Sequence, residues 1–400
     1  MKIRLTNVSV VTPRAEDIAD LLIEGERIAA ILPRSREADP GSDWRVLDGG
    51  GAILFPGTID LLQHGYGAHL YNDTEPDAVA ANARLLLRNG VTGFLPSISC
   101  LPPATLEPTL SRLSDQSVKA NAHQGTKIGA RVLGLHSEGP GFGVPGAHNP
   151  ENIQLLSVGL AERMIEAAAG LLKAVTLAPE VPGAEDFIRR LKAEGVSVHF
   201  GHSRARPEDI PRYVGWGIDA VTHMFNVMPT YPPGNMGVHV VSLSDALLAE
   251  PGLALGLVCD GIHVDPQLVR LLAQLPEDRL FLETDAMKFT GTGGATFEFF
   301  PGYRVTSIPG QAVREEISGG LCGSCLASDE AVRNFIAFTG RSLVRAAHAA
   351  SLVPARLLGM ERDLGSLETG KLADFTLLDR ASLIPKATWI SGREVWSAAA

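Results

Sequence analysis

The chain has few of the features that mark special classes of protein. Its 400 residues include four cysteines, too few for a disulfide-built scaffold of this length. It has no long uninterrupted apolar run, so we expect neither a signal peptide nor a membrane-spanning helix. Acidic residues outnumber basic ones by 45 to 35, and the net charge of -10 argues against nucleic acid or an anionic membrane as partner. These absences favour an ordinary globular protein of the cytoplasm.

The two ends of the chain have the pattern of β-strands. Residues 3–11 and 21–32 carry alternating or β-branched apolar positions. Residues 373–378 and 389–395 repeat this pattern near the C-terminus, with a glycine turn at Gly392. We therefore predict a small β-sandwich domain built from both chain ends, over 1–54 and 358–400.

The region between them, 55–357, alternates short apolar runs with helical patterns. The eight runs are 52–59, 93–96, 130–136, 174–177, 196–200, 220–223, 253–259 and 280–283. Helical segments lie between them, for example 77–89, 161–172, 184–194 and 266–275. Eight strand–helix alternations predict an α/β fold, a (β/α)8 TIM barrel, as the catalytic domain.

Polar residues gather where these strands end. In sequence order they are Asp60, His64, His136, Glu138, His199, His202, His223, Asp260, His263 and Asp285. The C-terminal ends of barrel strands meet at one rim, so such side chains can surround one ion. Imidazole and carboxylate groups suit zinc and related divalent metals, which make water nucleophilic at neutral pH. The sequence therefore predicts a metal-dependent hydrolase.

Cys322 and Cys325 form the only Cys-x-x-Cys pair. A redox dithiol would need a thioredoxin-like strand and helix around it, and a thiolate zinc site would need two further cysteines. We favour a loop of small residues before a helix near Asp329.

Seven motifs resemble those of the N-acetylglucosamine-6-phosphate deacetylases, a family of the amidohydrolase superfamily. They lie at 56–60, 136–140, 146–150, 201–203, 222–228, 260–265 and 284–286. A further stretch, 365–374, is similar to one found widely in the superfamily. The resemblance covers most of the chain and implies the same barrel and a homodimer.

The resemblance also implies roles for individual residues. Glu138, His202 and His223 would bind one divalent metal ion, with zinc the first choice and iron, cobalt or manganese as alternatives. Asp285 would act as the general acid and base, with His263 beside it in catalysis. The residues expected to contact substrate are His148, Asn226, Val227, His263 and His64.

The sequence departs from the family pattern at two places. Many superfamily members have His-x-His after the first strand to hold a second metal, but here Leu62 precedes Gln63 and His64, so we expect one metal. The family's arginine after the 222–228 motif is missing from 229–237, which weakens recognition of a phosphate. Arg304, His239 or a neighbouring subunit could replace it. The aromatic segment 287–304 is either an apolar lid over the substrate or a packed loop.

We therefore expect hydrolysis of the N-acetyl group of an acetylated amino sugar, with N-acetylglucosamine 6-phosphate the first candidate. An unphosphorylated sugar or another N-acyl small molecule is the alternative. A cyclic-amide hydrolase or deaminase usually needs the His-x-His pair or a bridging lysine, and neither is apparent. A barrel that has lost activity and only binds a ligand would not need to retain the four residues Glu138, His202, His223 and Asp285.

Overall fold

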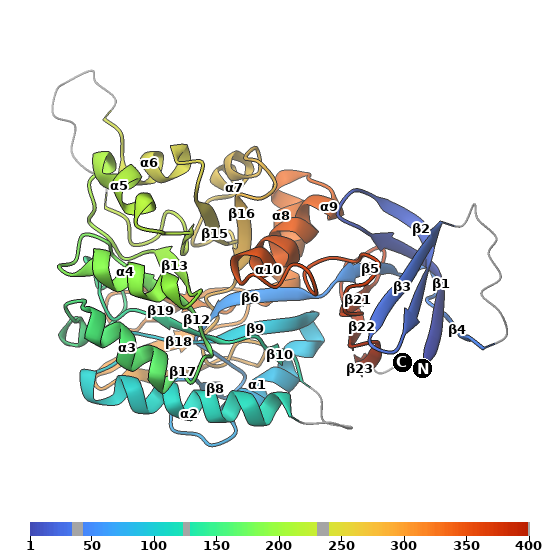
Figure 1. Cartoon of the computed structure of the whole chain (residues 1–400), viewed down its shortest axis with the longest axis horizontal. Helices are drawn as coiled ribbons and strands as arrows, with labels where there is room; N and C mark the ends of the chain where they lie inside the picture. The colour runs from blue at the N-terminus through green and yellow to red at the C-terminus, as the bar shows by residue number, and fades with distance from the viewer. Residues whose placement is uncertain (34–42, 123–128, 230–239, 399–400) are drawn as a thin grey trace.

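The chain folds into a parallel barrel with a separate β-sheet at one side (Figure 1). This computed structural model describes residues 1–33, 43–122, 129–229 and 240–398. The barrel strands are β6 (Thr58–Gln63), β9 (Val91–Ile98), β11 (Leu135–Glu138), β12 (Leu172–Leu177), β13 (Ser197–Phe200), β14 (Ala220–Val221), β15 (Ala254–Val258) and β16 (Leu280–Glu283). Neighbours pair in parallel from β6 through β9 to β16. The barrel closes where the Asp285 N–H donates to the Leu62 carbonyl at 2.9 Å. The predicted barrel is confirmed.

Helices follow the strands and cover the barrel from outside (Figure 1). They are α1 (Ala78–Leu86), α2 (Pro103–Asn121), α3 (Val158–Ala167), α4 (Ala184–Ala193), α5 (Ile210–Gly215), α6 (Leu243–Ala249), α7 (Pro266–Leu272), α8 (Ser328–Thr339), α9 (Leu343–Ala347) and α10 (Val353–Leu357). Local sequence explains their ends. The Ser157 side chain caps α3 by accepting from the Leu160 N–H. None of these helices, within the described part of the chain, is long and apolar enough to cross a membrane.

Both chain ends build the second sheet, as predicted. Its strands are β1 (Lys2–Val11), β2 (Glu16–Glu24), β3 (Arg27–Pro33), β4 (Arg45–Asp48), β5 (Ile53–Pro56), β21 (Phe375–Leu378), β22 (Pro385–Ile390) and β23 (Arg393–Ser397). The strands from both chain ends lie together on one side of the barrel (Figure 1). The sheet has its own apolar core, in which the Phe375 ring stacks on Trp389 with centroids 5.3 Å apart.

Three sequence segments divide differently from the prediction. The run 52–59 is two strands, because β5 joins the second sheet and β6 the barrel, with Gly57 between them. A Cβ atom at Gly57 would lie 2.1 Å from the Thr92 Oγ1 atom, so this crossing point needs glycine. Residues 21–32 break at Gly25 into β2 and β3. The predicted helix 161–172 is too long at its C-terminal end, because Ala169 and Gly170 take positive φ and Leu172 begins β12.

A small antiparallel sheet follows the last barrel strand. Its strands are β17 (Ala295–Phe300), β18 (Tyr303–Ser307), β19 (Ala312–Glu315) and β20 (Leu321–Ser324). A two-stranded ribbon, β7 (Gly65–Tyr66) and β8 (His69–Leu70), follows the first barrel strand. The segment 287–304 is thus neither a simple lid nor a loop, because β17 and part of β18 belong to this sheet.

Candidate active site

One cavity of about 300 Å³ opens at the C-terminal rim of the barrel, and all nine predicted site residues line it. They are His64, Glu138, His148, His202, His223, Asn226, Val227, His263 and Asp285. This volume is at the lower end of the range for small-molecule sites and suits a ligand about as large as a monosaccharide. The strands bring together residues that are up to 221 positions apart, from His64 to Asp285.

The residues after the strands adopt unusual backbone conformations. His202 and Asp285 have φ of 51°, and His223 has φ of 34°. L-residues other than glycine rarely adopt positive φ, and such strain concentrates at functional sites. The bend turns each side chain into the cavity directly after its strand ends. Hydrogen bonds hold these bends, since the His223 N–H donates to the Glu283 Oε1 atom at 2.5 Å.

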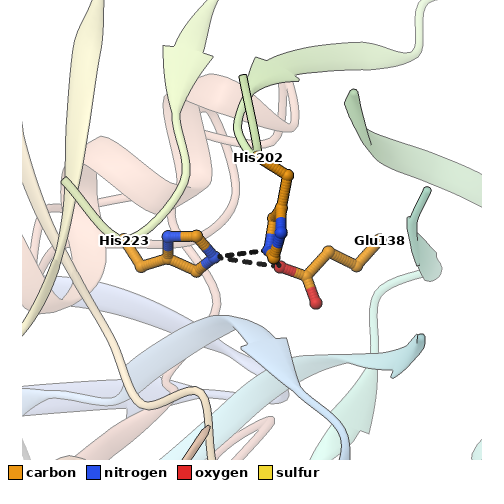
Figure 2. A group of neighbouring side chains, drawn as sticks. All are labelled: Glu138, His202 and His223. Atoms are coloured by element: carbon orange, nitrogen blue, oxygen red, sulfur yellow. Dashed lines mark hydrogen bonds and ion pairs between the residues drawn. The ribbon is translucent and has the colours of Figure 1, made fainter. Parts of the chain in front are cut away.

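Glu138, His202 and His223 converge on one point (Figure 2). The Glu138 Oε1 atom lies 3.2 Å from the His202 Nε2 atom and 3.0 Å from the His223 Nε2 atom, and the two nitrogens are 3.2 Å apart. Ligand atoms about 2 Å from a tetrahedral ion lie roughly 3.3 Å from one another, so this triangle fits a divalent metal. The His202 Nδ1–H donates to the Val144 carbonyl at 3.0 Å, which leaves the Nε2 lone pair free for a ligand.

The charges of this group also favour a cation. Burial acts to raise the pKa of Glu138, but the imidazoles of His148, His202 and His223 outweigh it and hold that pKa well below its ordinary value. Burial lowers the pKa of His202 to about 4. Burial acts to lower the pKa of His223, but the hydrogen bond to Glu138 and the negative charges of Glu138, Asp285 and Glu283 together raise it to about 9. The buried Glu138 carboxylate therefore favours positive charge beside it, which a divalent ion would supply.

The second oxygen of Glu138 faces two more histidines. Its Oε2 atom lies 2.9 Å from the His64 Nε2 atom and 3.1 Å from the His148 Nε2 atom. The His148 Nδ1 atom accepts from the Cys100 N–H at 3.3 Å, so its Nε2 atom carries the proton and can donate into the cavity. His64 also approaches Asp285, with 3.5 Å between Nε2 and Oδ1.

Asp285 lines the same cavity as the triangle, with only 12% of its side chain exposed. Burial raises the pKa of its carboxyl above the ordinary value, while the imidazole of His64 acts in the opposite direction. Its backbone is fixed on both sides, since the N–H donates to Leu62 and the carbonyl accepts from the Ser324 N–H at 2.8 Å. A carboxyl group held this way can exchange a proton without moving far.

Asp260 is a residue of the site whose role the sequence reasoning missed. Its Oδ2 atom lies 2.6 Å from the His263 Nδ1 atom, so the Nδ1–H donates and the Nε2 atom is left to face the cavity. The i,i+3 spacing of the two residues was the available signal. Asn226 donates to the His263 carbonyl at 3.1 Å, and its buried Oδ1 atom has no hydrogen-bond partner within the described residues.

Three strand-end candidates, His136, His199 and Asp60, are buried below the cavity and do not line it. His136 is two positions before Glu138 on the same strand, but it contacts Thr176 and Ser97 inside the barrel. His199 contacts Ser197 in the same layer. Burial lowers the pKa of both imidazoles to about 3, so they are neutral packing residues. Side chains of alternate residues point into the barrel at successive layers, and only the uppermost layer borders the cavity.

Asp60 is also buried below the cavity, where it accepts from the Thr284 Oγ1 atom at 2.6 Å.

Two residues of this chain, Arg304 and His239, were expected to replace the missing arginine. The Arg304 guanidinium pairs with Glu316 at 2.9 Å, is 61% exposed and does not line the cavity. His239 lies outside the described residues.

Cys322 and Cys325 are free thiols, as are Cys100 and Cys259, and all four are buried. The predicted small-residue loop is wrong in part, because Leu321–Ser324 is the strand β20. Cys322 lines the cavity, and burial raises the pKa of its thiol well above the ordinary value, so it is neutral. The Cys325 Sγ atom lies 2.9 Å from the Ser307 Oγ atom.

Comparison with known proteins places this site in a family. The model of the amidohydrolase family matches residues 53–395. N-acetylglucosamine-6-phosphate deacetylase of Bos taurus is 33% identical over 405 residues, which cover 98% of this chain and 95% of that protein. The chain belongs to the N-acetylglucosamine-6-phosphate deacetylase family of the amidohydrolases. Amidohydrolases are metal-dependent hydrolases of carbon–nitrogen bonds, in agreement with the prediction.

Further members of this deacetylase family support the assignment. N-acetylgalactosamine-6-phosphate deacetylase of Escherichia coli O157:H7 is 35% identical and covers 85% of this chain and 87% of its own length. The crystal structure of N-acetylglucosamine-6-phosphate deacetylase from Pasteurella multocida superposes with a TM-score of 0.87 at 25% identity, over 98% of this chain and 99% of that one. The names of the relatives differ in the sugar, so family membership alone does not select one epimer.

Proposed function

We propose that this protein is a cytoplasmic deacetylase that hydrolyses the N-acetyl group of an acetylated amino sugar to give acetate and the free amine. N-acetylglucosamine 6-phosphate is the first substrate to test, because the relatives from Bos taurus and Homo sapiens, among others, are named for it. The observation that carries the proposal is the convergence of three ligand atoms in a cavity that a buried carboxyl group, that of Asp285, also lines. A homodimer is the assembly we expect from the family.

Glu138, His202 and His223 would hold one divalent ion, for which zinc is our first choice and iron, cobalt or manganese the alternatives. When bound, the ion would polarise the acetyl carbonyl and make water a better nucleophile. Leu62, where many relatives in the superfamily have a ligand, is an alkyl side chain with no exposed surface, which favours a single ion.

Asp285 would move the proton. As a carboxylate it takes a proton from the attacking water while the water oxygen bonds to the carbonyl carbon. It then gives that proton to the amide nitrogen as the carbon–nitrogen bond breaks, so the amine leaves neutral and the second proton of the water remains on acetic acid, which ionises to acetate at neutral pH. A raised pKa suits both steps, because a group with a pKa nearer neutrality both accepts and returns a proton readily.

The remaining residues would hold the substrate. His148, oriented by the Cys100 N–H, presents an Nε2–H that can donate to the developing oxyanion or to a sugar hydroxyl. His263, oriented by Asp260, presents an Nε2 atom that can accept from a sugar hydroxyl. The unpartnered Asn226 Oδ1 atom can accept from a substrate N–H or hydroxyl. We include the Val227 backbone and His64 in the same contact surface.

Acetate release tests the proposal directly. Purified protein loaded with zinc should release acetate from N-acetylglucosamine 6-phosphate, and a chelator should stop the reaction. Glu138→Gln, which keeps the shape of the side chain but removes its negative charge, should lose both bound metal and acetate release. Stoichiometric metal without acetate release from any acetylated amino sugar would exclude the deacetylase and leave a ligand-binding barrel.

A further inference from the structure

The backbone bend at His223 is held by three different strands. The N–H groups of Thr222 and Met224 donate to backbone carbonyls of β13 and β15, at 2.9 and 2.8 Å. Between them, the His223 N–H donates to a side chain, that of Glu283 on β16, at 2.5 Å from the Oε1 atom. The bond to Glu283 is therefore the one of the three that depends on the identity of a side chain.

Glu283 reaches His223 across an intervening strand. His223 follows the end of β14, Glu283 ends β16, and β15 lies between these two strands in the barrel. Gly256 of β15 leaves room for the carboxyl group, because a Cβ atom at this position would overlap the Oε1 and Cδ atoms of Glu283. A glycine on one strand and a glutamate on the next are thus matched to each other.

Stability alone does not account for a carboxyl group at this position. Glu283 is 1% exposed, and its Oε2 atom has no hydrogen-bond partner within the described residues. Burying such a group costs free energy that an apolar side chain of similar size would not cost. The hydrogen bond that the Oε1 atom accepts goes to a residue that would bind metal, so the benefit of this carboxyl group lies at His223.

His223 depends on its backbone more than the other imidazole ligand does. The His202 ring is fixed at its Nδ1 atom by the Val144 carbonyl, as described above. The His223 Nδ1 atom is buried and has no hydrogen-bond partner in the part of the chain that the structure describes. Metal-bound imidazoles usually have such a partner, which sets the direction of the ring. For His223 that direction comes from the backbone bend, at a φ of 34°.

We infer that Glu283 is a positioning residue for the metal site, because its carboxyl group holds the His223 backbone in the bend that directs the Nε2 atom toward the other two ligands (Figure 2). This inference rests on the proposed metal site and names a residue that sets its affinity. Glu283 does not line the cavity, so it acts through His223 and not on the substrate. Either charge state of the carboxyl group leaves Oε1 able to accept the N–H, so the effect comes from the hydrogen bond.

Two substitutions of similar size test the inference. Glu283→Met removes the acceptor and keeps an unbranched side chain, whereas Glu283→Gln keeps an amide oxygen that can accept from the His223 N–H. The dissociation constant for zinc is measured by competition with a chromophoric chelator. It should rise roughly 10- to 100-fold for Glu283→Met and stay near the wild-type value for Glu283→Gln. At saturating zinc, kcat and KM of Glu283→Met should approach those of wild type, because the three ligands are intact.

Leu282→Ala is the matched control for a loss of stability. Leu282 is the preceding residue of β16, lies on the opposite face of the strand and packs in the main apolar core. This variant should unfold at a lower urea concentration and still bind zinc with the wild-type dissociation constant. Glu283→Met should show the reverse, because the metal-free protein should keep a urea midpoint near that of wild type while its zinc binding weakens.

Three results would overturn the inference. They are an unchanged dissociation constant for zinc in Glu283→Met, the same increase in Glu283→Gln as in Glu283→Met, and the same increase in Leu282→Ala. Glu283→Ala also removes the acceptor and decides the matter if Glu283→Met does not fold. Zinc binding is measured without substrate, so the test does not depend on deacetylation. A wild-type protein that binds no zinc would refute the proposed metal site as well, whereas an unchanged constant in Glu283→Met refutes only the role of Glu283.

Discussion

Replacing Asp285 with asparagine separates proton transfer from every other role of this side chain. Asparagine has nearly the same size and, like aspartate, tolerates the positive φ of 51° at this position, whereas alanine would add strain. The two backbone hydrogen bonds of residue 285, to Leu62 and from Ser324, do not involve the side chain and should remain. The variant should therefore fold and bind metal, and lose only a group that accepts and returns a proton.

The expected loss is that of general acid–base catalysis, a factor of about 10²–10⁴ in kcat. At 1.36 kcal/mol per decade this corresponds to roughly 3–5 kcal/mol of lost transition-state stabilisation. Burial supports this size of effect, since a side chain that is only 12% exposed is not readily replaced by bulk water. KM should change little, because the group acts in the transition state.

Acetate release and metal content, measured on the same preparations, decide the matter. Asp115→Asn, the same substitution on the exposed face of α2, is the control and should match wild type. Near-normal turnover of Asp285→Asn at full metal content would remove Asp285 from the mechanism. A loss of metal together with activity, partly restored by added zinc, would make it a ligand.

Three other outcomes follow from the structure. Elemental analysis should find about one divalent ion per chain, and His202→Gln should lose it; two tightly held ions would contradict the single site. Burial raises the pKa of Asp60 to about 6, above its value of 3.8 when unfolded, so its stability contribution is present below pH 3.8 and lost as the pH rises through 6. The free energy of unfolding of Asp60→Asn, measured in urea, should therefore rise relative to that of wild type by up to roughly 3 kcal/mol as the pH increases from 4 to 8. A difference between the two proteins that stays the same at every pH would refute the raised pKa. In the same urea experiment, Phe375→Ala should lower the free energy of unfolding by about 3–5 kcal/mol, because it empties a buried site. Ile317→Ala, at a site 93% exposed, should leave that free energy almost unchanged.

The sequence by itself determined the barrel and the members of its site. Strand-end positions such as Glu138, His202, His223 and Asp285 follow from the alternation of apolar runs and helices, because parallel strands must end on one rim. His148 and Val227 came only from the motifs, since neither ends a strand. The missing arginine was also visible in the sequence alone, because an absent residue type cannot be restored by folding.

Tertiary structure decided which strand-end residues share a layer. His136 and Glu138 are two positions apart and both point inward, yet only Glu138 reaches the cavity, because the tilt of the strands sets the height of each side chain. Sequence could not show that Asp260 would orient His263. Nor could it show that strand β20, which follows Asp285 by some 36 residues, would return to form a wall beside it. Contacts between distant segments depend on packing, and the periodicity that reveals each strand contains no information about its neighbours.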